Sequence, residues 1–496
     1  MTETVADSGP GPQLPITFSA PPNPEEEFVR LLALAGEHEA AGRLDEAETL
    51  LQRLLADDSN RPRALHLLGV VRFRQGRASE AVADVERAIT LMPGAALFHR
   101  NLCEMYRKLK RYDEALAVGR RAVELGPNDI HAHHNLAVLH YHRLEPDDAI
   151  RCAETVLKLA PDMPGAHFGI AESCLLTGDL ERGWEEYEWR FKLANTAPLM
   201  PQTDRPQWDG RKLSADQTLL LIADQGYGDV IQFSRYIPWA ALRCPAISVA
   251  CSRELHPVIR QFTAVGTLFD HWDDKPDFAA WLPLSGLPRL AGTRVDTIPA
   301  DIPYLRADPA KAAEWAACLA ALSPQGYHRV GVVWAGRPTY TNDDSRSTSL
   351  ATFAPLADLS RVTLFSLQKG ETQAQIGNYW GRAPLINLGP EIRDYGDTMA
   401  IIDSLDLVVT VDTSVAHLAG AMGKPVWIML PYAPDWRWLL DRDDSPWYPT
   451  ARLFRQSAAR DWQSVVATIA GEIARTMPQF HPDLPPETVD LAPARQ

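Results

Sequence analysis

The sequence predicts an α-solenoid followed by an α/β region of two Rossmann-like domains with a cleft between them. Two observations lead to this prediction. Small and apolar residues recur every 34 positions before about residue 197, and short aliphatic runs alternate with amphipathic helical segments from about residue 215. The 496 residues are also too many for one ordinary hydrophobic core. At roughly 150 residues per domain, the length suggests about three domains.

The repeating unit consists of two amphipathic helices joined by a short turn and ended by a Gly-Pro or similar pair. We expect the recurrent alanine where the two helices approach closely, because a larger side chain would separate them. Spacing and residue types resemble the tetratricopeptide repeat over about 28–197, with a fifth, degenerate unit in which Gly183 replaces the alanine. The phased series are Ala47, Ala81, Ala115 and Ala149; Leu34, Leu68, Leu102, Leu136 and Ile170; and Pro93, Pro127 and Pro161.

The solenoid, expected over 25–197, predicts a groove that binds a protein or an extended peptide, and the alternative is a rigid spacer. A histidine cluster in the fourth unit raises the question of a metal site. Solvated imidazoles are the commoner explanation and no cysteine or carboxylate is expected to complete a site, so we predict no metal. The cluster comprises His131, His133, His134, His140 and His142.

The two chain termini and the composition exclude several classes of protein. Residues 1–24 are rich in Pro, Gly and Ser and predict a disordered leader, and 481–496 predict a flexible tail. The formal charge of −15 argues against a nucleic-acid partner, which normally needs a basic face. Six scattered cysteines and the lack of a long apolar run predict reduced thiols, no membrane span and a cytoplasmic location.

The second half alternates strand and helix, which is typical of parallel sheets covered by helices. Aliphatic runs at 218–223 and 246–251 begin a first Rossmann-like domain over 198–310. A run at 329–336 begins a second such domain over 325–480. Because ligands of parallel sheets bind beyond the carboxyl ends of the strands, the loops there are the candidate sites.

The strongest candidate follows a buried strand and opens a helix, in the segment LVVTVDTSVAHLAGAMGKP. Backbone N–H groups at that helix start, together with two hydroxyl groups, would bind a diphosphate. The alternative is that the polar residues only cap the helix, and the pattern leaves both open. The residues are Asp412, Thr413, Ser414, Ala416 and His417.

A second candidate is the segment QGYGD after the first strand of the α/β region. Gly226 and Gly228 would let the backbone approach a ligand, with Gln225 beside them. Asp229 could act as a general base toward an acceptor hydroxyl, and the alternative is again a helix cap.

Basic and polar residues on two further loops could neutralise a diphosphate without a metal ion, whereas any single one is more often a solvated surface group. They are Arg337, Asn342 and Arg346 in one loop and Lys369 in the other. A later loop, which includes the residues DWRW, carries tryptophans that could stack on a base or simply pack.

Together, QGYGDVIQFSRYIP, VGVVWAGRP, NDDSRS, SLQKG and DTSVAHLAGAMGKPVW with DWRW resemble the bacterial heptosyltransferase-type glycosyltransferases, in the branch that carries N-terminal tetratricopeptide repeats. The resemblance covers about 28–475 and implies a GT-B fold and a metal-independent, generally inverting enzyme that needs no cofactor. It also implies that Asp229 matches the family's base. Lys369, Asp412, Thr413, Ser414 and His417 match positions around the donor diphosphate.

The resemblance implies transfer of a sugar from a nucleotide-sugar donor to an acceptor. It also implies that 198–310 form the acceptor side and 325–480 the nucleotide-sugar side. Lipopolysaccharide heptosyltransferases lack a solenoid, so ADP-heptose and lipid A do not carry over as substrates. Repeats joined to a GT-B unit are similar to protein O-GlcNAc transferases and flagellin-modifying enzymes, and this favours a protein acceptor. The alternatives are a non-catalytic adaptor with a degenerate glycosyltransferase domain, and a nucleotide-sugar epimerase.

Overall fold

The computed structural model describes residues 23–194, 201–339, 342–458 and 460–476. The predicted leader 1–24 and tail 481–496 therefore lie almost wholly outside the described residues. The chain divides into two compact units, 1–139 and 140–496. None of the helices in the described ranges is long and apolar enough to cross a membrane.

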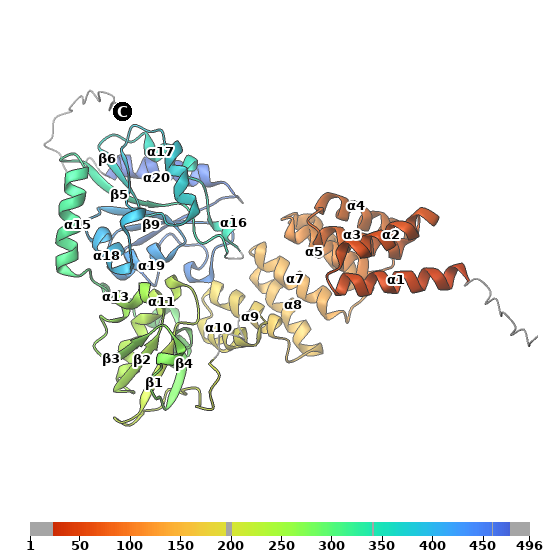
Figure 1. Ribbon diagram of the computed structural model, residues 1–496, viewed down its shortest axis with the longest axis horizontal. Coiled ribbons are helices and arrows are strands. Elements are labelled where there is room, and N and C mark those ends of the chain that lie inside the picture. The colour runs from red at the N-terminus through yellow and green to blue at the C-terminus, as the bar shows by residue number, and fades with distance from the viewer. Residues whose placement is uncertain (1–22, 195–200, 340–341, 459, 477–496) are drawn as a thin grey trace, which may run out of the picture. The chain divides into compact units, whose positions relative to one another are not determined.

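The first unit is built from antiparallel helix pairs, as the 34-residue period predicts (Figure 1). The recurrent alanines are fully buried between paired helices, with Ala47, Ala81 and Ala115 at 0% exposure. This confirms a helical solenoid of tetratricopeptide type. The helices are α1 (Pro24–Ala40), α2 (Leu44–Asp57), α3 (Pro62–Arg74), α4 (Ala78–Leu91), α5 (Ala96–Lys108), α6 (Tyr112–Leu125) and α7 (Ile130–His142), the last of which crosses into the second unit.

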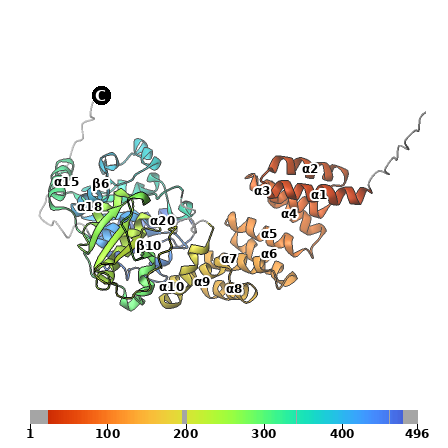
Figure 2. The same ribbon diagram turned by 60° about the horizontal axis from the view of Figure 1, so that its bottom comes forward.

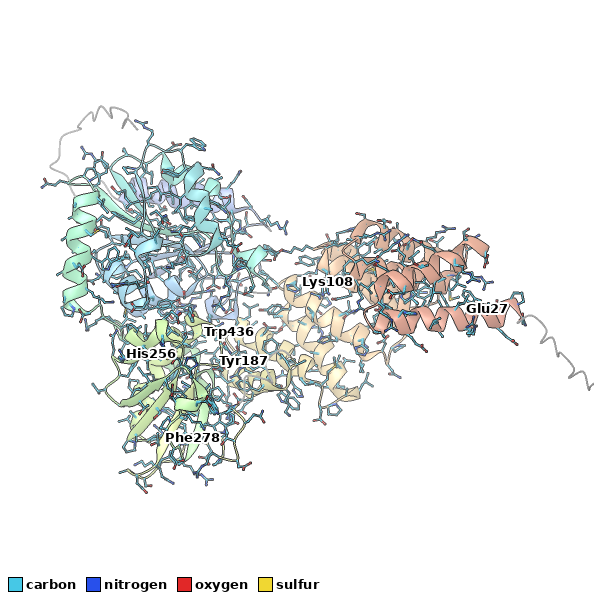
Figure 3. All side chains as sticks on the ribbon, in the orientation of Figure 1. Glu27, Lys108, Tyr187, His256, Phe278 and Trp436 are labelled. Atoms are coloured by element: carbon cyan, nitrogen blue, oxygen red, sulfur yellow. The ribbon has the colours of Figure 1, made fainter. Side chains whose placement is uncertain are left out.

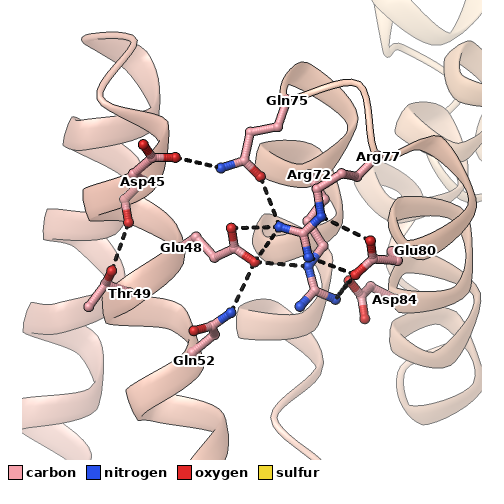
Figure 4. Close-up of polar contacts among 9 residues, drawn as sticks. All are labelled: Asp45, Glu48, Thr49, Gln52, Arg72, Gln75, Arg77, Glu80 and Asp84. Carbon is pink, nitrogen blue, oxygen red and sulfur yellow. Dashed lines mark hydrogen bonds and ion pairs between the residues drawn. The ribbon is translucent and has the colours of Figure 1, made fainter.

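Successive pairs of the first unit are also joined by charged side chains (Figure 4). Glu48 of α2 accepts hydrogen bonds from Arg77 at 2.7 Å and from Arg72 at 3.2 Å. Arg72 of α3 also pairs with Asp84 of α4 at 2.7 Å. Each of these side chains is at least half-buried, so the pairs are less screened by salt than surface pairs are.

The second unit begins with the last helices of the repeats, α8 (Pro146–Leu159), α9 (Pro164–Thr177) and the short α10 (Leu180–Tyr187). Gly183 of α10 lies against α9, and a Cβ at this position would be 2.6 Å from Cδ2 of Leu175. The terminal pair thus packs too closely even for the alanine that the other units carry. Glu188–Lys192 then continues as a 3-10 turn.

Two parallel sheets follow, and both lie in the second unit (Figures 1 and 2). The first has the order β3-β2-β1-β4 and the second the order β10-β9-β8-β5-β6-β7. The strands are β1 (Thr218–Ile222), β2 (Ala246–Ala250), β3 (Val265–Phe269), β4 (Ala280–Pro283), β5 (His328–Val333), β6 (Val362–Ser366), β7 (Leu385–Asn387), β8 (Leu407–Val411), β9 (Val426–Leu430) and β10 (Ala451–Arg455).

Helices cover the sheets as the βα pattern predicts, and this confirms two Rossmann-like sheets consistent with a GT-B fold. The longest, α15 (Pro309–Leu322) and α20 (Trp462–Thr476), flank the second sheet. The others are α11 (Tyr227–Phe233), α12 (Ile237–Ala241), α13 (His256–Ile259), α14 (Leu287–Leu290), α16 (Asp343–Arg346), α17 (Ala354–Ala357), α18 (Tyr395–Asp403) and α19 (Ser414–Ala421). The domain limits 198–310 and 325–480 stay predictions.

One hydrophobic core runs through the terminal repeat and both sheets. It includes Leu175 of α9, Trp184 of α10, Leu221 of β1 and Ile428 of β9. A second core lies on the other face of the second sheet, beneath α20. The terminal repeat is therefore packed as part of the α/β region.

Strand order places the candidate loops. In the first sheet β1 lies between β2 and β4, and in the second sheet β5 lies between β6 and β8. In each sheet the strand order reverses at this central strand. The loops that follow the two neighbouring strands then lead to opposite faces of the sheet and leave room for a ligand between them. The QGYGD segment follows β1, the segment 336–347 follows β5, and the Asp412 segment follows β8.

Candidate functional site

Asp229 occupies the third position of α11, directly beyond the carboxyl end of β1. Its carboxylate accepts a hydrogen bond from the backbone of Gly226, the residue that caps this helix. Gly226 and not Asp229 is therefore the cap residue, and the Asp229 carboxylate only bonds back to it. The same carboxylate also forms an ion pair with Arg437, and its side chain remains 22% exposed.

Arg437 connects the first sheet to the loop after β9. Its Nε donates to Oε1 of Gln232 at 2.7 Å and its Nη1 donates to Asp435 at 2.8 Å, while Nη2 reaches Asp229. Nη2 also donates to Oε1 of Gln225 at 3.5 Å, and Nε2 of Gln225 donates to the Tyr187 hydroxyl at 2.9 Å. Arg437 is almost fully buried, so its charge is neutralised by these carboxylates instead of by water.

Arg437, Asp435 and Tyr187 were not among the site residues predicted from the sequence. The only signal for the first two was the DWRW segment, which formed part of the family resemblance. Arg437 and Asp229 are 208 positions apart in the chain, and periodicity carries no information about such a contact.

The start of α19 lies beyond β8, as predicted. Thr413 takes the cap position, but its side chain makes no capping hydrogen bond to the helix. Its hydroxyl is 3.0 Å from that of Thr410, and the Ser414 hydroxyl accepts a hydrogen bond from Tyr395 at 2.7 Å. The first N–H groups of this helix therefore lack a capping side chain at Thr413, which is a condition for binding an anion.

His417 and Ala416 lie on the first turn of α19, and both are buried. The His417 Nδ1 is 2.9 Å from the Tyr448 hydroxyl, and its Nε2 is 3.9 Å from Oδ1 of Asp412. Its ring stacks on Trp438 with 5.4 Å between ring centroids. Trp438 is thus a packing partner of the site histidine.

The two candidate segments meet at Gly228 and His417. A Cβ on Gly228 would lie 2.7 Å from Cδ2 of His417 and 3.5 Å from Cα of Ser414. The glycine is required by this close approach of α11 to α19, and its backbone angles are those of an ordinary helix. The structure thus brings Gly226, Gly228 and Asp229 of the first sheet to Asp412, Ser414 and His417 of the second.

Burial and like charges shift the acid–base behaviour of this group. Burial raises the pKa of Asp229, and Arg437 opposes that rise. Burial and then Asp435 raise the pKa of Asp412 to about 6. Burial, Arg437, Arg235 and Arg346 hold the pKa of His417 well below its ordinary value. The imidazole is therefore neutral at pH 7, and both aspartates are more basic than in water.

The predicted basic residues lie in different surroundings. Nη1 of Arg346 donates to the backbone carbonyl of Asp412 at 3.1 Å, so Arg346 lies next to the start of α19. Arg337 has its guanidinium carbon 5.5 Å from the ring centroid of Tyr227. Asn342 is exposed just before α16.

Lys369 is engaged elsewhere. Its Nζ donates to the carbonyl oxygens of Ile392 at 2.6 Å and Gly389 at 3.0 Å, and these bonds fix the segment after β7. Within the described ranges, no hydrogen bond or ion pair joins Lys369 to the start of α19. Its assignment to the diphosphate stays a prediction, which would require the amine to leave two carbonyl partners.

Only one of the five histidines considered for metal binding lies in a group of possible ligands within the described ranges. His140, Glu145 and Asp148 have ligand atoms within 4.8 Å of one another. From the sequence no carboxylate was expected near these histidines, and this expectation is wrong for His140. Glu145 also accepts from Arg143 at 3.0 Å, and Asp148 pairs with Arg151. Both carboxylates thus have cationic partners within the chain, which is the usual arrangement of surface pairs.

A separate open cavity of about 670 Å³ lies beyond the carboxyl ends of β1, β2 and β3. Ile222, Ala250, Phe269, Arg253 and Trp272 are among the residues that line it. The sequence-predicted site residues are not part of its lining. It borders the same edge of the first sheet as Asp229.

Comparison with known proteins identifies the repeats. A family model described as "Tetratricopeptide repeat" matches residues 32–96, 75–130 and 134–188. Protein FlbA of Caulobacter vibrioides is 28% identical over 334 residues, which are 61% of this chain and 54% of FlbA. The match thus spans about half the length of that relative.

Two solved structures that are similar to this chain each cover about a third of it. YrrB, described as a TPR protein with an unusual peptide-binding site, has 20% identity and a TM-score of 0.30, over 35% of this chain and 89% of its own. A thermophilic TPR protein of Thermus thermophilus, TTC0263, has 24% identity and a TM-score of 0.30, over 34% of this chain and 92% of its own. The chain is a tetratricopeptide-repeat protein over residues 32–188, followed by an α/β region with two parallel sheets.

Proposed function

We propose that the protein is a glycosyltransferase that moves a sugar from a nucleotide-sugar donor to a hydroxyl group of an acceptor. The observation that carries this proposal is the meeting of Asp229 with the uncapped start of α19. A partly buried carboxylate of raised basicity and an anion-binding helix start are the two groups that such a reaction needs. They come from different sheets and touch through Gly228 and His417.

The donor diphosphate would bind at the N–H groups that begin α19, beside the Ser414 hydroxyl and the Arg346 guanidinium. These fixed donors would stabilise the charge that develops on the leaving diphosphate. Asp412 suits this place because its pKa is already raised to about 6. An arriving anion would raise that pKa further, so Asp412 would take up a proton and donate a hydrogen bond instead of repelling the ligand.

Asp229 would remove the proton from the acceptor hydroxyl. The acceptor oxygen then forms a bond to the anomeric carbon, the bond from that carbon to the diphosphate oxygen breaks, and the electron pair leaves with the nucleoside diphosphate. Attack opposite the leaving group inverts the anomeric centre. Arg437 holds Asp229 through its Oδ1, and the exposed part of the carboxylate would face the acceptor.

Tetratricopeptide repeats suggest peptide binding, because stacked helix pairs offer an extended surface. A protein acceptor therefore fits this chain better than a free sugar. The two alternatives, a non-catalytic adaptor and an epimerase, have no feature of the site in their favour.

The test is calorimetry of the full chain against ADP-, GDP-, UDP-, dTDP- and CMP-linked sugars. We expect one nucleotide to bind and Ser414→Ala together with Arg346→Gln to weaken it. Asp229→Asn should leave donor binding intact and abolish both transfer and donor hydrolysis. Asp301→Asn, at an exposed site, is the matched control. Absence of binding across the panel would refute the proposal.

A further inference from the structure

The terminal repeat, α9 with α10, packs against the turn that carries Arg437. Helix α9 lies on this Trp436–Trp438 turn. The Trp436 ring is 5.3 Å from that of Trp184 and 6.2 Å from that of Tyr187, measured between centroids. Figure 3 shows Tyr187 and Trp436 next to each other. Tyr187 is the last residue of α10 and is only 5% exposed, so packing leaves its ring little freedom.

The hydroxyl group of Tyr187 holds the first residue of the QGYGD segment. It accepts a hydrogen bond from Nε2 of Gln225 at 2.9 Å. Oε1 of the same amide accepts a hydrogen bond from Nη2 of Arg437 at 3.5 Å. Because a guanidinium group has donors only, Arg437 fixes the oxygen end of the amide, and the nitrogen end then has to face Tyr187. Gln225 is thus held at both ends of its amide group.

Arg190, in the 3-10 turn after α10, holds the residue before Gln225. Its Nη2 pairs with Oδ2 of Asp224 at 3.5 Å, and its Nη1 donates to the carbonyl oxygen of Tyr187 at 2.8 Å. Asp224 also accepts a hydrogen bond from the backbone N–H of Ser285, beyond β4, at 3.3 Å. The side chains of Arg190 and Asp224 are 4% and 2% exposed, so water and salt screen this ion pair little. Asp224 therefore joins the terminal repeat to the ends of β1 and β4.

These two contacts lie directly before the proposed base in the chain. Gly226, the cap of α11, follows Gln225, and Asp229 is on the first turn of that helix. The Asp229 carboxylate bonds back to the backbone of Gly226, so a shift of Gln225 would move Gly226 and with it the carboxylate. A displacement of about 1 Å at a reacting group can lower a rate about a hundredfold.

We propose that Tyr187 and Arg190 of the terminal repeat are positioning residues for Asp229. The inference rests on the glycosyl-transfer function proposed above. Tyr187 acts through Gln225, and Arg190 acts through the residue before it, so neither has to contact the donor or the acceptor. The last repeat is therefore a working part of the site in the α/β region, in addition to any role of the repeats in binding a protein.

The test compares donor binding with turnover in Tyr187→Phe, which removes only the hydroxyl group. The probe is whichever ADP-, GDP-, UDP-, dTDP- or CMP-linked sugar the full chain binds in calorimetry, and turnover is its hydrolysis, followed by the released nucleotide. We expect hydrolysis to slow about tenfold, the size of one hydrogen bond, and the donor Kd to stay within about twofold. Tyr106→Phe is the matched control, because Tyr106 is also 5% exposed in a repeat helix and its hydroxyl also bonds to one side chain, that of Glu86.

A double-mutant comparison separates positioning from a general loss of packing. In a Gln225→Leu background the Tyr187 hydroxyl group has lost its partner, so adding Tyr187→Phe should change the hydrolysis rate by less than about twofold. Arg190→Lys keeps the charge but loses the planar fork that reaches both the Tyr187 carbonyl and Asp224. We expect the same pattern in this variant, slower hydrolysis with an unchanged donor Kd.

Hydrolysis at the wild-type rate in Tyr187→Phe, or an equal loss in Tyr106→Phe, would overturn the inference. So would a full-sized effect of Tyr187→Phe in the Gln225→Leu background, or a loss of donor affinity that accounts for the slower hydrolysis. If the wild-type chain bound no donor, or hydrolysed it independently of Asp229 or not at all, the proposed function would be refuted and the inference with it.

Discussion

Gly228 of α11 and His417 of α19 lie so close that a methyl group on the glycine would be 2.7 Å from the imidazole Cδ2. The contact joins a loop of the first sheet to a helix of the second. Its closeness leaves the imidazole little freedom, because Tyr448 and Trp438 hold the ring from other sides.

Gly228→Ala adds only one methyl group, but it should disturb the site strongly because there is no space for that group. We expect the free energy of unfolding to fall by about 1–3 kcal/mol, the usual cost of overpacking, and nucleotide-sugar affinity to fall with it. Denaturant unfolding and calorimetry measure the two effects. Gly471→Ala in α20 is the control, since nothing lies within 4 Å of that Cβ position and alanine favours a helix. If Gly228→Ala bound the nucleotide sugar with unchanged affinity, this contact would not contribute to donor binding.

Asp412 should couple donor binding to protonation. Its pKa is about 6 in the free protein, with Asp435 adding to the effect of burial. A diphosphate beside it should raise that pKa further, so binding near neutral pH takes up protons and affinity falls as the pH rises above that value. Calorimetry in two buffers of different ionisation enthalpy measures the uptake. In Asp412→Asn the uptake should be reduced, and proton release on binding would contradict this assignment.

Glu172 should make the chain less stable as the pH rises. The pKa of this carboxyl is about 8 in the folded chain, against an ordinary value of 4.5. The folded state therefore binds more protons than the unfolded state between these values, and the stabilisation is lost across that window. Thermal unfolding followed across the same window should show a decline that is smaller in Glu172→Gln. A parallel decline in both proteins would show that Glu172 is not protonated.

Arg437 should matter for stability as well as for activity. Arg437→Met would leave Asp229 and Asp435 without their buried cation, and we expect a loss of about 3–5 kcal/mol in unfolding free energy. Arg442→Met removes an exposed pair with Asp444 and should change stability by about 0–1 kcal/mol. Urea unfolding of the two variants measures the difference. Similar losses in both would mean that water replaces the Arg437 contacts.

Local patterns predicted most of the fold. The alanine series marked the helix pairs because each pair repeats the same contact, and the aliphatic runs marked strands such as β1 and β8. The choice between a cap and a ligand site could not be made from the sequence, since Asp and Ser suit both. The structure shows Asp229 in a cap contact and no capping side chain at Thr413, where α19 starts.

Contacts between segments that are far apart in the chain could not be predicted from the sequence. Lys369 was expected at a diphosphate because it follows a strand, yet its amine bonds to the carbonyls of Gly389 and Ile392. Glu172 carried no signal, because its position in the repeat is occupied by Val70, Glu104 and Val138 in other units. Only the packing of α9 on the Trp436–Trp438 turn brings this helix close to the site.

The shared core of the terminal repeat and the two sheets has a practical consequence for dividing the chain. A fragment that started at residue 198, where the sequence suggests a boundary, would lose Leu175, Trp184 and Tyr187 and would uncover the apolar residues beneath them. The smallest piece that keeps the proposed site intact thus has to begin before Pro164.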